Sequence, residues 1–169
     1  MLLPLISNGL VRLIADITPN TPRASSNVSH RVCEIEEKGP EVKIKLNSVI
    51  VRDQEHALRF YTEVLGFIKK VEIPVGDYKW LTVVSPDEPE GTQLVLEPDA
   101  HPASATFQKA LFETGTPLTS FAVDDVQSEV ERLKGLGVTF SMDPTDVGTA
   151  IIAVFDDTCG NFIQIYQET

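Results

Sequence analysis

Two side chains with acid–base chemistry stand four positions apart in the sequence, Glu97 and His101, in the stretch "EPDAHPAS". Glu97 ends the apolar run "TQLVLE", which predicts a β-strand, and His101 follows in a polar loop. A carboxylate and an imidazole can bind a cation or a hydroxyl group, or exchange a proton with a carbon acid. Each also has a plain structural interpretation, as a strand-end charge and a solvated loop residue. Glu97 and His101 are therefore candidate catalytic residues whose role stays open.

Other kinds of catalytic chemistry find little support in the sequence. It contains neither a glycine-rich phosphate loop nor a GxSxG motif, which argues against nucleotide binding and serine hydrolysis. The histidines, His30, His56 and His101, all lie outside the predicted strands. Cys33 and Cys159 are far apart and form no CxxC motif, so neither thiol chemistry nor a zinc site is indicated.

The charge balance excludes one class of partner. The chain of 169 residues has a net charge of −11 and no cluster of Lys and Arg, whereas nucleic-acid binding requires such a cluster. No apolar run approaches the length of a membrane span, and the N-terminal residues lack the basic start of a secretory signal. We expect no nucleic acid and no membrane as partners. The isolated cysteines favour a cytoplasmic location.

The elements that must position the candidate residues occur twice along the chain. "VIVRDQEHALRFYTEVLGF" (49–67) predicts a strand, a helix capped by Asp53 and a stop at Gly66. "FAVDDVQSEVERLKGLGVTF" (121–140) repeats this plan, with Asp124 or Asp125 as the cap. Each copy is followed by segments that read as three further strands, near 67–73, 78–85 and 92–97, and near 138–142, 148–155 and 161–166.

This repeat predicts an α+β fold of two tandem βαβββ modules. We divide the chain into an N-terminal extension (1–41), a first module (42–98), a connector with a short helix in "SATFQKALFE" (99–117) and a second module (118–169). The extension is rich in Pro, Ser, Thr and Asn, so we expect it to be flexible, and it is an open question whether it belongs to the native protein. Two half-covered sheets joined together form a half-open barrel around a cleft.

The sequence resembles the vicinal oxygen chelate superfamily, which contains glyoxalase I, bleomycin-resistance proteins and extradiol dioxygenases. The resemblance spans about 44–167 and rests on the two repeated stretches and on "AVFDDTCGNFIQIYQ", which is similar to the family's Asp-Pro-x-Gly-Asn turn. It implies a homodimer and, in the enzymes, one divalent metal held by four side chains. Those positions fall on Leu46, Glu97, Leu118 and Gln164.

This set of residues does not suit a metal ion. Leucine has no lone pair, and one carboxylate with one amide cannot replace the usual histidines and glutamates. We therefore predict no metal and no cofactor. Strand alternation puts the same positions on the cleft side. The predicted ligand-binding residues, taken together, are Leu46, Ser48, Trp80, Glu97, Leu118, Ser120, Gln164 and Tyr166.

The leading hypothesis is a glyoxalase/bleomycin-resistance-like protein that binds a small organic molecule in the cleft without the family's catalytic metal. The alternative is a lyase, isomerase or dioxygenase of the same superfamily, with a metal at non-standard positions or metal-free catalysis by Glu97 and His101. A third possibility is a partner-binding or dimerisation module. The sequence does not decide whether the protein is an enzyme, and it does not identify the ligand.

Overall fold

The computed structural model describes residues 42–169, and residues 44–169 form one compact unit. The predicted N-terminal extension, 1–41, lies outside the described residues. The first module contains these elements in chain order: β1 (Leu46–Val51), α2 (Gln54–Arg59), the π-helical turn η1 (Phe60–Val64), β2 (Ile68–Val75), β3 (Tyr78–Val84) and β4 (Gln93–Pro98). The connector forms α3 (Pro102–Glu113). The second module contains β5 (Pro117–Ala122), α4 (Val126–Gly135), β6 (Phe140–Asp146), β7 (Ala150–Asp156) and β8 (Phe162–Glu168).

Both helix starts follow from the predicted aspartate caps. The Asp53 carboxylate accepts hydrogen bonds from the backbone N–H groups of Glu55 and His56, at 2.8 and 2.9 Å. Asp125, one of the two candidates, accepts from the N–H of Ser128 at 2.8 Å. These bonds satisfy N–H groups that have no partner inside the helix.

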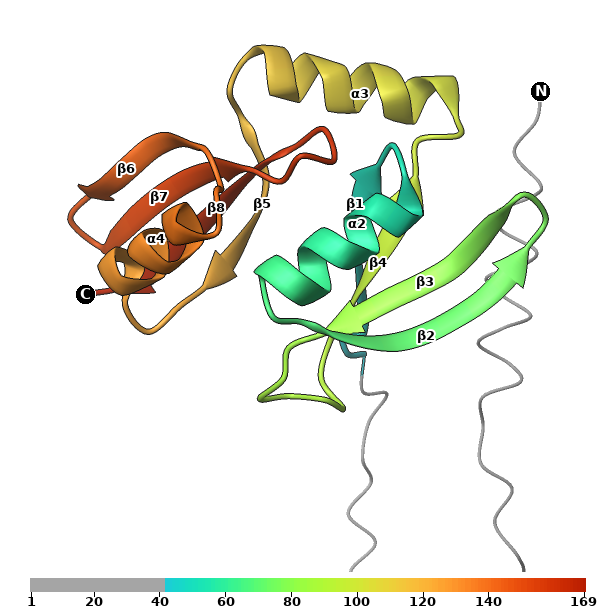
Figure 1. The fold of residues 1–169 in the computed structure, drawn as a ribbon, viewed down its shortest axis with the longest axis horizontal. Helices are drawn as coiled ribbons and strands as arrows, with labels where there is room; N and C mark the ends of the chain where they lie inside the picture. The colour runs from blue at the N-terminus through green and yellow to red at the C-terminus, as the bar shows by residue number, and fades with distance from the viewer. Residues whose placement is uncertain (1–41) are drawn as a thin grey trace, which may run out of the picture. The chain divides into compact units, whose positions relative to one another are not determined.

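The strands form two four-stranded sheets, seen in Figure 1. The first sheet has the order β1-β4-β3-β2 and the second has the equivalent order β5-β8-β7-β6. In each, the outer strand of the βα unit pairs in parallel with the last strand, and the remaining pairs are antiparallel. The α+β class and the tandem βαβββ plan are therefore confirmed, and the two sheets are not closed into a barrel.

The hydrophobic core lies between the sheets and the helices α2 and α4. In the first sheet, alternate residues reach this core, so the residues between them point to the opposite face. The core residues of the first sheet are Val49, Val51, Leu81, Val83, Leu94 and Leu96. Aromatic rings link the two modules within the core, since the rings of Phe60 and Phe155 lie 6.3 Å apart.

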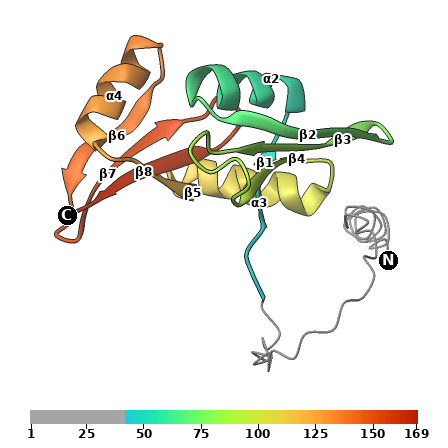
Figure 2. The same ribbon diagram turned by 90° about the horizontal axis from the view of Figure 1, so that it is seen from below.

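The connector helix α3 packs on the other side of the strands from α2 and α4 (Figure 2). Its start, Pro102, comes two residues before the predicted stretch, because His101 caps the helix and proline suits its first turn. The ring of Phe112 stacks on Phe162 of β8, with centroids 4.7 Å apart and planes 5° from parallel. The connector is thus an integral part of the folded unit.

Candidate functional site

The first group of predicted ligand-binding residues lies on the face of the first sheet that points away from α2, which we call the open face. Ser48 pairs with Val95 and Ile50 with Glu97 between β1 and β4. Leu46 and Ser48 share the side of Ile50 on β1, because residues two apart on a strand point the same way. Across β3, Trp80 pairs with Ile73. Leu46, Ser48, Trp80 and Glu97 thus occupy one face.

The second sheet presents an equivalent face, turned away from the core residues Ile163 and Ile165. Ser120 pairs with Gln164, and the amide nitrogen of Gln164 donates to the Ser120 hydroxyl oxygen at 2.9 Å. Tyr166, two residues further along β8, lies on the same face and pairs with Ile152. The structure therefore brings Ser120, Gln164 and Tyr166 together.

Leu118 and His101 differ from the other predicted residues. The pairing of β5 with β8 shifts register between Pro117 and Thr119, and the Leu118 side chain packs against the hydrophobic core. Simple alternation missed this, because a bulge inserts a residue and changes which way its neighbours point. The His101 ring nitrogen Nδ1 accepts a hydrogen bond from the N–H of Ala103 at 3.1 Å. His101 therefore has a structural task as the cap of α3.

The family's metal would need donors at Leu46, Glu97, Leu118 and Gln164. The two leucines provide none, which leaves the Glu97 carboxylate and the amide oxygen of Gln164, whose amide nitrogen donates to Ser120. Within residues 42–169, no group of three or more His, Cys, Asp or Glu side chains is arranged to hold a metal ion. The side chains at these positions therefore do not fit the family's divalent ion.

A shallow pocket of about 260 Å³ opens beside the first sheet, where β1 and β4 end and β3 begins. Its lining is mixed in charge and includes Arg52, Glu55, Tyr78, Lys79 and Pro98. None of the eight predicted ligand-binding residues lines it. A larger enclosed cleft would require another surface to cover the open face.

A buried polar cluster, which the sequence reasoning missed, joins the two modules. We call it the junction cluster: Tyr61, Gln108, Asp157 and Asn161. The Tyr61 hydroxyl donates to Asp157 Oδ2 at 2.9 Å, and the Asn161 amide donates to the same oxygen at 2.7 Å. Asp157 Oδ1 accepts from the N–H groups of Cys159 and Asn161, at 2.8 and 2.9 Å.

The junction cluster also forms hydrogen bonds to β1 of the first module. The amide nitrogens of Gln108 and Asn161 both donate to the carbonyl oxygen of Ile50, at 2.8 Å each. Gln108, Asp157 and Asn161 are at most 2% exposed, so these bonds replace water entirely. The signal in the sequence was the turn "DDTCGN" between β7 and β8, together with a glutamine on the inner side of a helix.

Burial raises the pKa of Asp157 above its usual value of 3.8, and its hydrogen bonds act in the opposite direction. The folded protein therefore keeps this proton at pH values where the unfolded chain has released it. The contribution of Asp157 to stability is complete below pH 3.8 and is lost as the pH rises through the raised pKa.

We expect wild type to lose stability relative to Asp157→Asn over this range, measured as urea midpoints at each pH. A constant difference between the two proteins would contradict the expectation.

The family model of the Glyoxalase/Bleomycin resistance protein/Dioxygenase superfamily matches residues 43–165. The chain belongs to this superfamily, which confirms the resemblance seen in the sequence. It is 55% identical over 127 residues to the uncharacterized protein YurT of Bacillus subtilis (strain 168), covering 75% of this chain and 100% of that protein.

Solved structures agree with this assignment. The crystal structure of UcmS2 matches with a TM-score of 0.67 and 30% identity, covering 76% of this chain and 100% of that one. TnmS3, an antibiotic binding protein from Streptomyces sp. CB03234, matches with a TM-score of 0.62 and 29% identity, covering 76% and 98%. In the part of the chain that the structure describes, no helix is long and apolar enough to cross a membrane.

Proposed function

We propose that this protein binds a small organic molecule against the open face of its sheets, without the catalytic metal of its enzyme relatives. The observation that carries the proposal is the donor set at the family's metal positions, where Leu46 and Leu118 supply no ligand atom. Apolar and aromatic side chains with a few polar groups are typical of small-molecule sites. TnmS3, which shares the fold, is an antibiotic binding protein.

The expected cytoplasmic location and homodimer belong to the same proposal. A second copy would supply the rim that completes a cleft, leaving Trp80 and Glu97 on the open face accessible to the ligand. The competing proposal is an enzyme that uses a metal at non-standard positions, or metal-free catalysis by Glu97 and His101. The capping bond at the His101 ring weighs against that pair, because the Nδ1 lone pair is already used. A stoichiometric divalent ion in protein purified without chelator, with activity lost in Glu97→Ala, would favour the enzyme.

The proposal is tested by a thermal-shift screen of aromatic antibiotics that includes metal-free bleomycin and doxorubicin. We expect at least one compound to raise the melting temperature equally with and without EDTA, since a ligand at 100 times its Kd stabilises by about 2.7 kcal/mol. Calorimetry then measures the Kd of that compound. A screen that never moves the melting temperature would instead favour a partner-binding module.

Two matched variants locate the binding surface. Ser48 is exposed on β1, the edge strand of the first sheet, and points to the open face beside Val95. Ser48→Trp therefore adds a bulky side chain to that face and leaves the core residues unchanged. We expect it to raise the Kd more than tenfold. Ser128, whose backbone N–H takes part in the cap of α4, carries an exposed side chain away from that face. Ser128→Trp is expected to bind as wild type, and equal binding by both variants would move the site elsewhere.

A further inference from the structure

The open face of the first sheet carries a carboxylate that forms no ion pair within residues 42–169. Strands β1, β2, β3 and β4 contain two acidic residues, Glu72 and Glu97. Glu72 pairs with Leu81, so its side chain lies on the α2 side. Glu97 pairs with Ile50 and points to the open face. Among residues 42–169, no side chain forms a hydrogen bond or an ion pair with Glu97.

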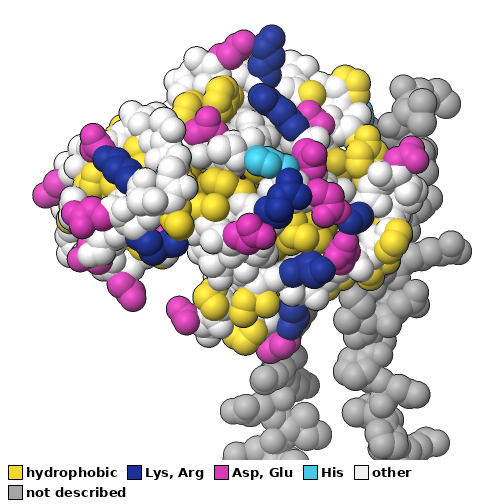
Figure 3. All heavy atoms as spheres, viewed as in Figure 1, with side chains coloured by type: hydrophobic (Ala, Val, Ile, Leu, Met, Phe, Trp, Pro, Cys, Tyr) yellow, Lys and Arg dark blue, Asp and Glu magenta, His cyan; other side chains and the backbone are white. Residues whose placement is uncertain are grey.

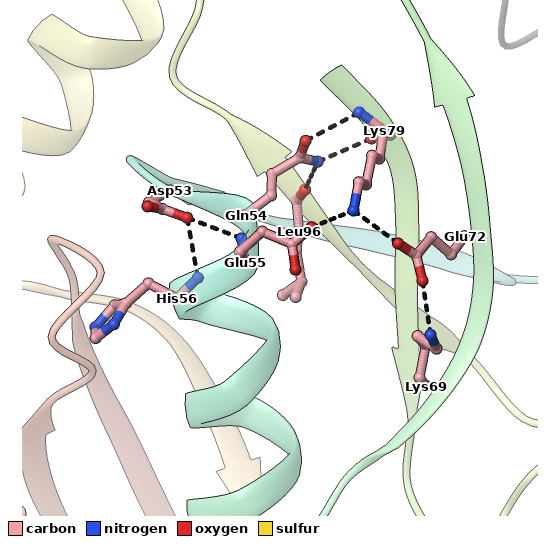
Figure 4. A network of polar contacts seen from close by, with 8 residues as sticks. All are labelled: Asp53, Gln54, Glu55, His56, Lys69, Glu72, Lys79 and Leu96. Atoms are coloured by element: carbon pink, nitrogen blue, oxygen red, sulfur yellow. Dashed lines mark hydrogen bonds and ion pairs between the residues drawn. The ribbon is translucent and has the colours of Figure 1, made fainter. Parts of the chain in front are cut away.

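The basic residues of the same strands form ion pairs with other glutamates. They are Lys69, Lys70 and Lys79. Lys69 and Lys79 bind Glu72 at 2.6 and 2.7 Å, and Lys79 also pairs with Glu55 of α2 (Figure 4). Lys70 pairs with Glu90 in the turn before β4, at 2.6 Å.

The two glutamates therefore differ in their electrostatic surroundings. The hydrogen bonds from Lys69 and Lys79 lower the pKa of Glu72 to about 2. Acidic and basic side chains are also interspersed on the α2 side of the molecule, as Figure 3 shows. Glu97 is half-buried among apolar neighbours and has no such partner.

Apolar and aromatic side chains surround Glu97 on the open face. Ile50 is its partner on β1. The direct pairing of β3 with β4 ends at Thr82 and Val95, and beyond it the Gln54 amide bridges the backbones of Lys79 and Leu96. Trp80 therefore lies on the same face, on the neighbouring strand, without pairing with Glu97. Beyond Trp80 lie Ile73 and Tyr78, which are 37% and 48% exposed. A face of this kind favours a hydrophobic body, and a carboxylate on the same face as an indole ring favours a positive charge.

We propose that the ligand of the open face is an amphiphilic organic cation, with an aromatic or aliphatic body and one protonated amine or quaternary centre. This inference rests on the proposed function and names the chemical class of its ligand. The cation pairs with the Glu97 carboxylate, which forms no ion pair within residues 42–169. Its body covers Ile73 and Tyr78 and contacts the indole of Trp80. The net charge of −11 further favours a cation over an anion.

Tetraphenylphosphonium and tetraphenylborate test the charge of the ligand, because they share size and shape and differ in sign. Trp80 is the single tryptophan, so its fluorescence reports binding at this face. We expect tetraphenylphosphonium to change the fluorescence with a Kd at least tenfold below that of tetraphenylborate. Glu97→Gln is expected to raise the Kd for tetraphenylphosphonium about tenfold and to leave the Kd for tetraphenylborate within twofold.

Glu131→Gln controls for net charge, because Glu131 lies on α4, where it accepts a hydrogen bond from the Gln127 amide at 3.0 Å. We expect it to change either Kd by less than twofold. Three results would overturn the cation proposal. The two ions could bind with equal Kd, Glu97→Gln and Glu131→Gln could change the Kd equally, or tetraphenylphosphonium could fail to bind. Binding of antibiotics in the thermal-shift screen would still stand in those cases, so the two proposals fail separately. A dimer that shields Trp80 from acrylamide and dissociates in Ser48→Trp would assign the face to a second copy and also overturn the proposal.

Discussion

Asp157→Ala is expected to lower the free energy of unfolding by about 3–5 kcal/mol. The carboxylate accepts four hydrogen bonds, from the Tyr61 hydroxyl, the Asn161 amide and the N–H groups of Cys159 and Asn161. Alanine leaves these donors without acceptors in a site that water does not reach, since Asp157 is 0% exposed. Chemical denaturation with urea, followed by circular dichroism, measures the loss.

The neighbouring residue provides a matched control for Asp157→Ala. Asp156 lies in the same turn and accepts one bond, from the N–H of Thr158 at 2.7 Å, and it is only partly buried. Asp156→Ala is therefore expected to cost about 1 kcal/mol. Equal losses in the two variants would mean that the turn as a whole, and not the junction cluster, determines the effect. Tyr61→Phe removes a single donor and should fall between them.

Gly160→Ala is expected to destabilise the protein by about 2–4 kcal/mol, for two separable reasons. Gly160 has φ of +106°, a backbone conformation that side chains disfavour. A Cβ atom there would also stand 2.8 Å from Nε of Arg52 and 2.9 Å from Nε2 of Gln108. The Gln108 amide cannot retreat freely, because it donates to Ile50, Cys159 and Asn161.

Gly148→Ala isolates the backbone contribution to this loss. Gly148 has a similar φ of +93°, and a Cβ atom added to it would meet nothing within 4 Å. Its substitution is expected to cost about 1–2 kcal/mol from backbone strain alone. The excess loss in Gly160→Ala then measures the crowding against Arg52 and Gln108. If both variants lose the same stability, the close approach of Gly160 to the junction cluster contributes nothing.

Periodicity in the sequence predicted the fold well, because each module satisfies its local rules independently. Asp53 caps α2 as predicted, and β1, with Val49 and Val51 toward the core, follows from simple alternation. Ser48 and Glu97 were placed on the open face by the same reasoning, and the pairings of β1 with β4 agree. Their role in ligand binding stays a prediction.

The parts that periodicity could not predict involve contacts between distant segments or irregular pairing. Gln108 is polar and sits on a helix, so nothing local indicates that it donates to Ile50, 58 residues away. Leu118 packs against the core beside a register shift on β5, which is not visible in composition, so its role in ligand binding stays a prediction. His101 carries a residue type suited to catalysis, yet its backbone context at the start of α3 gives it a capping role.

The junction cluster makes the two copies of the repeat unequal. The turn between β7 and β8 reaches across to the first module, through the bond from Asn161 to Ile50. The matching turn between β3 and β4 forms hydrogen bonds only to its own module in these contacts. Lys45 donates to the backbone carbonyl of Glu90, and Lys70 donates to its carboxylate. The two modules are therefore not exchangeable, because the second module donates the Asn161 hydrogen bond and the first module accepts it. A chain built from two first modules would lack the hydrogen bond from Asn161 to Ile50 that joins the two modules here.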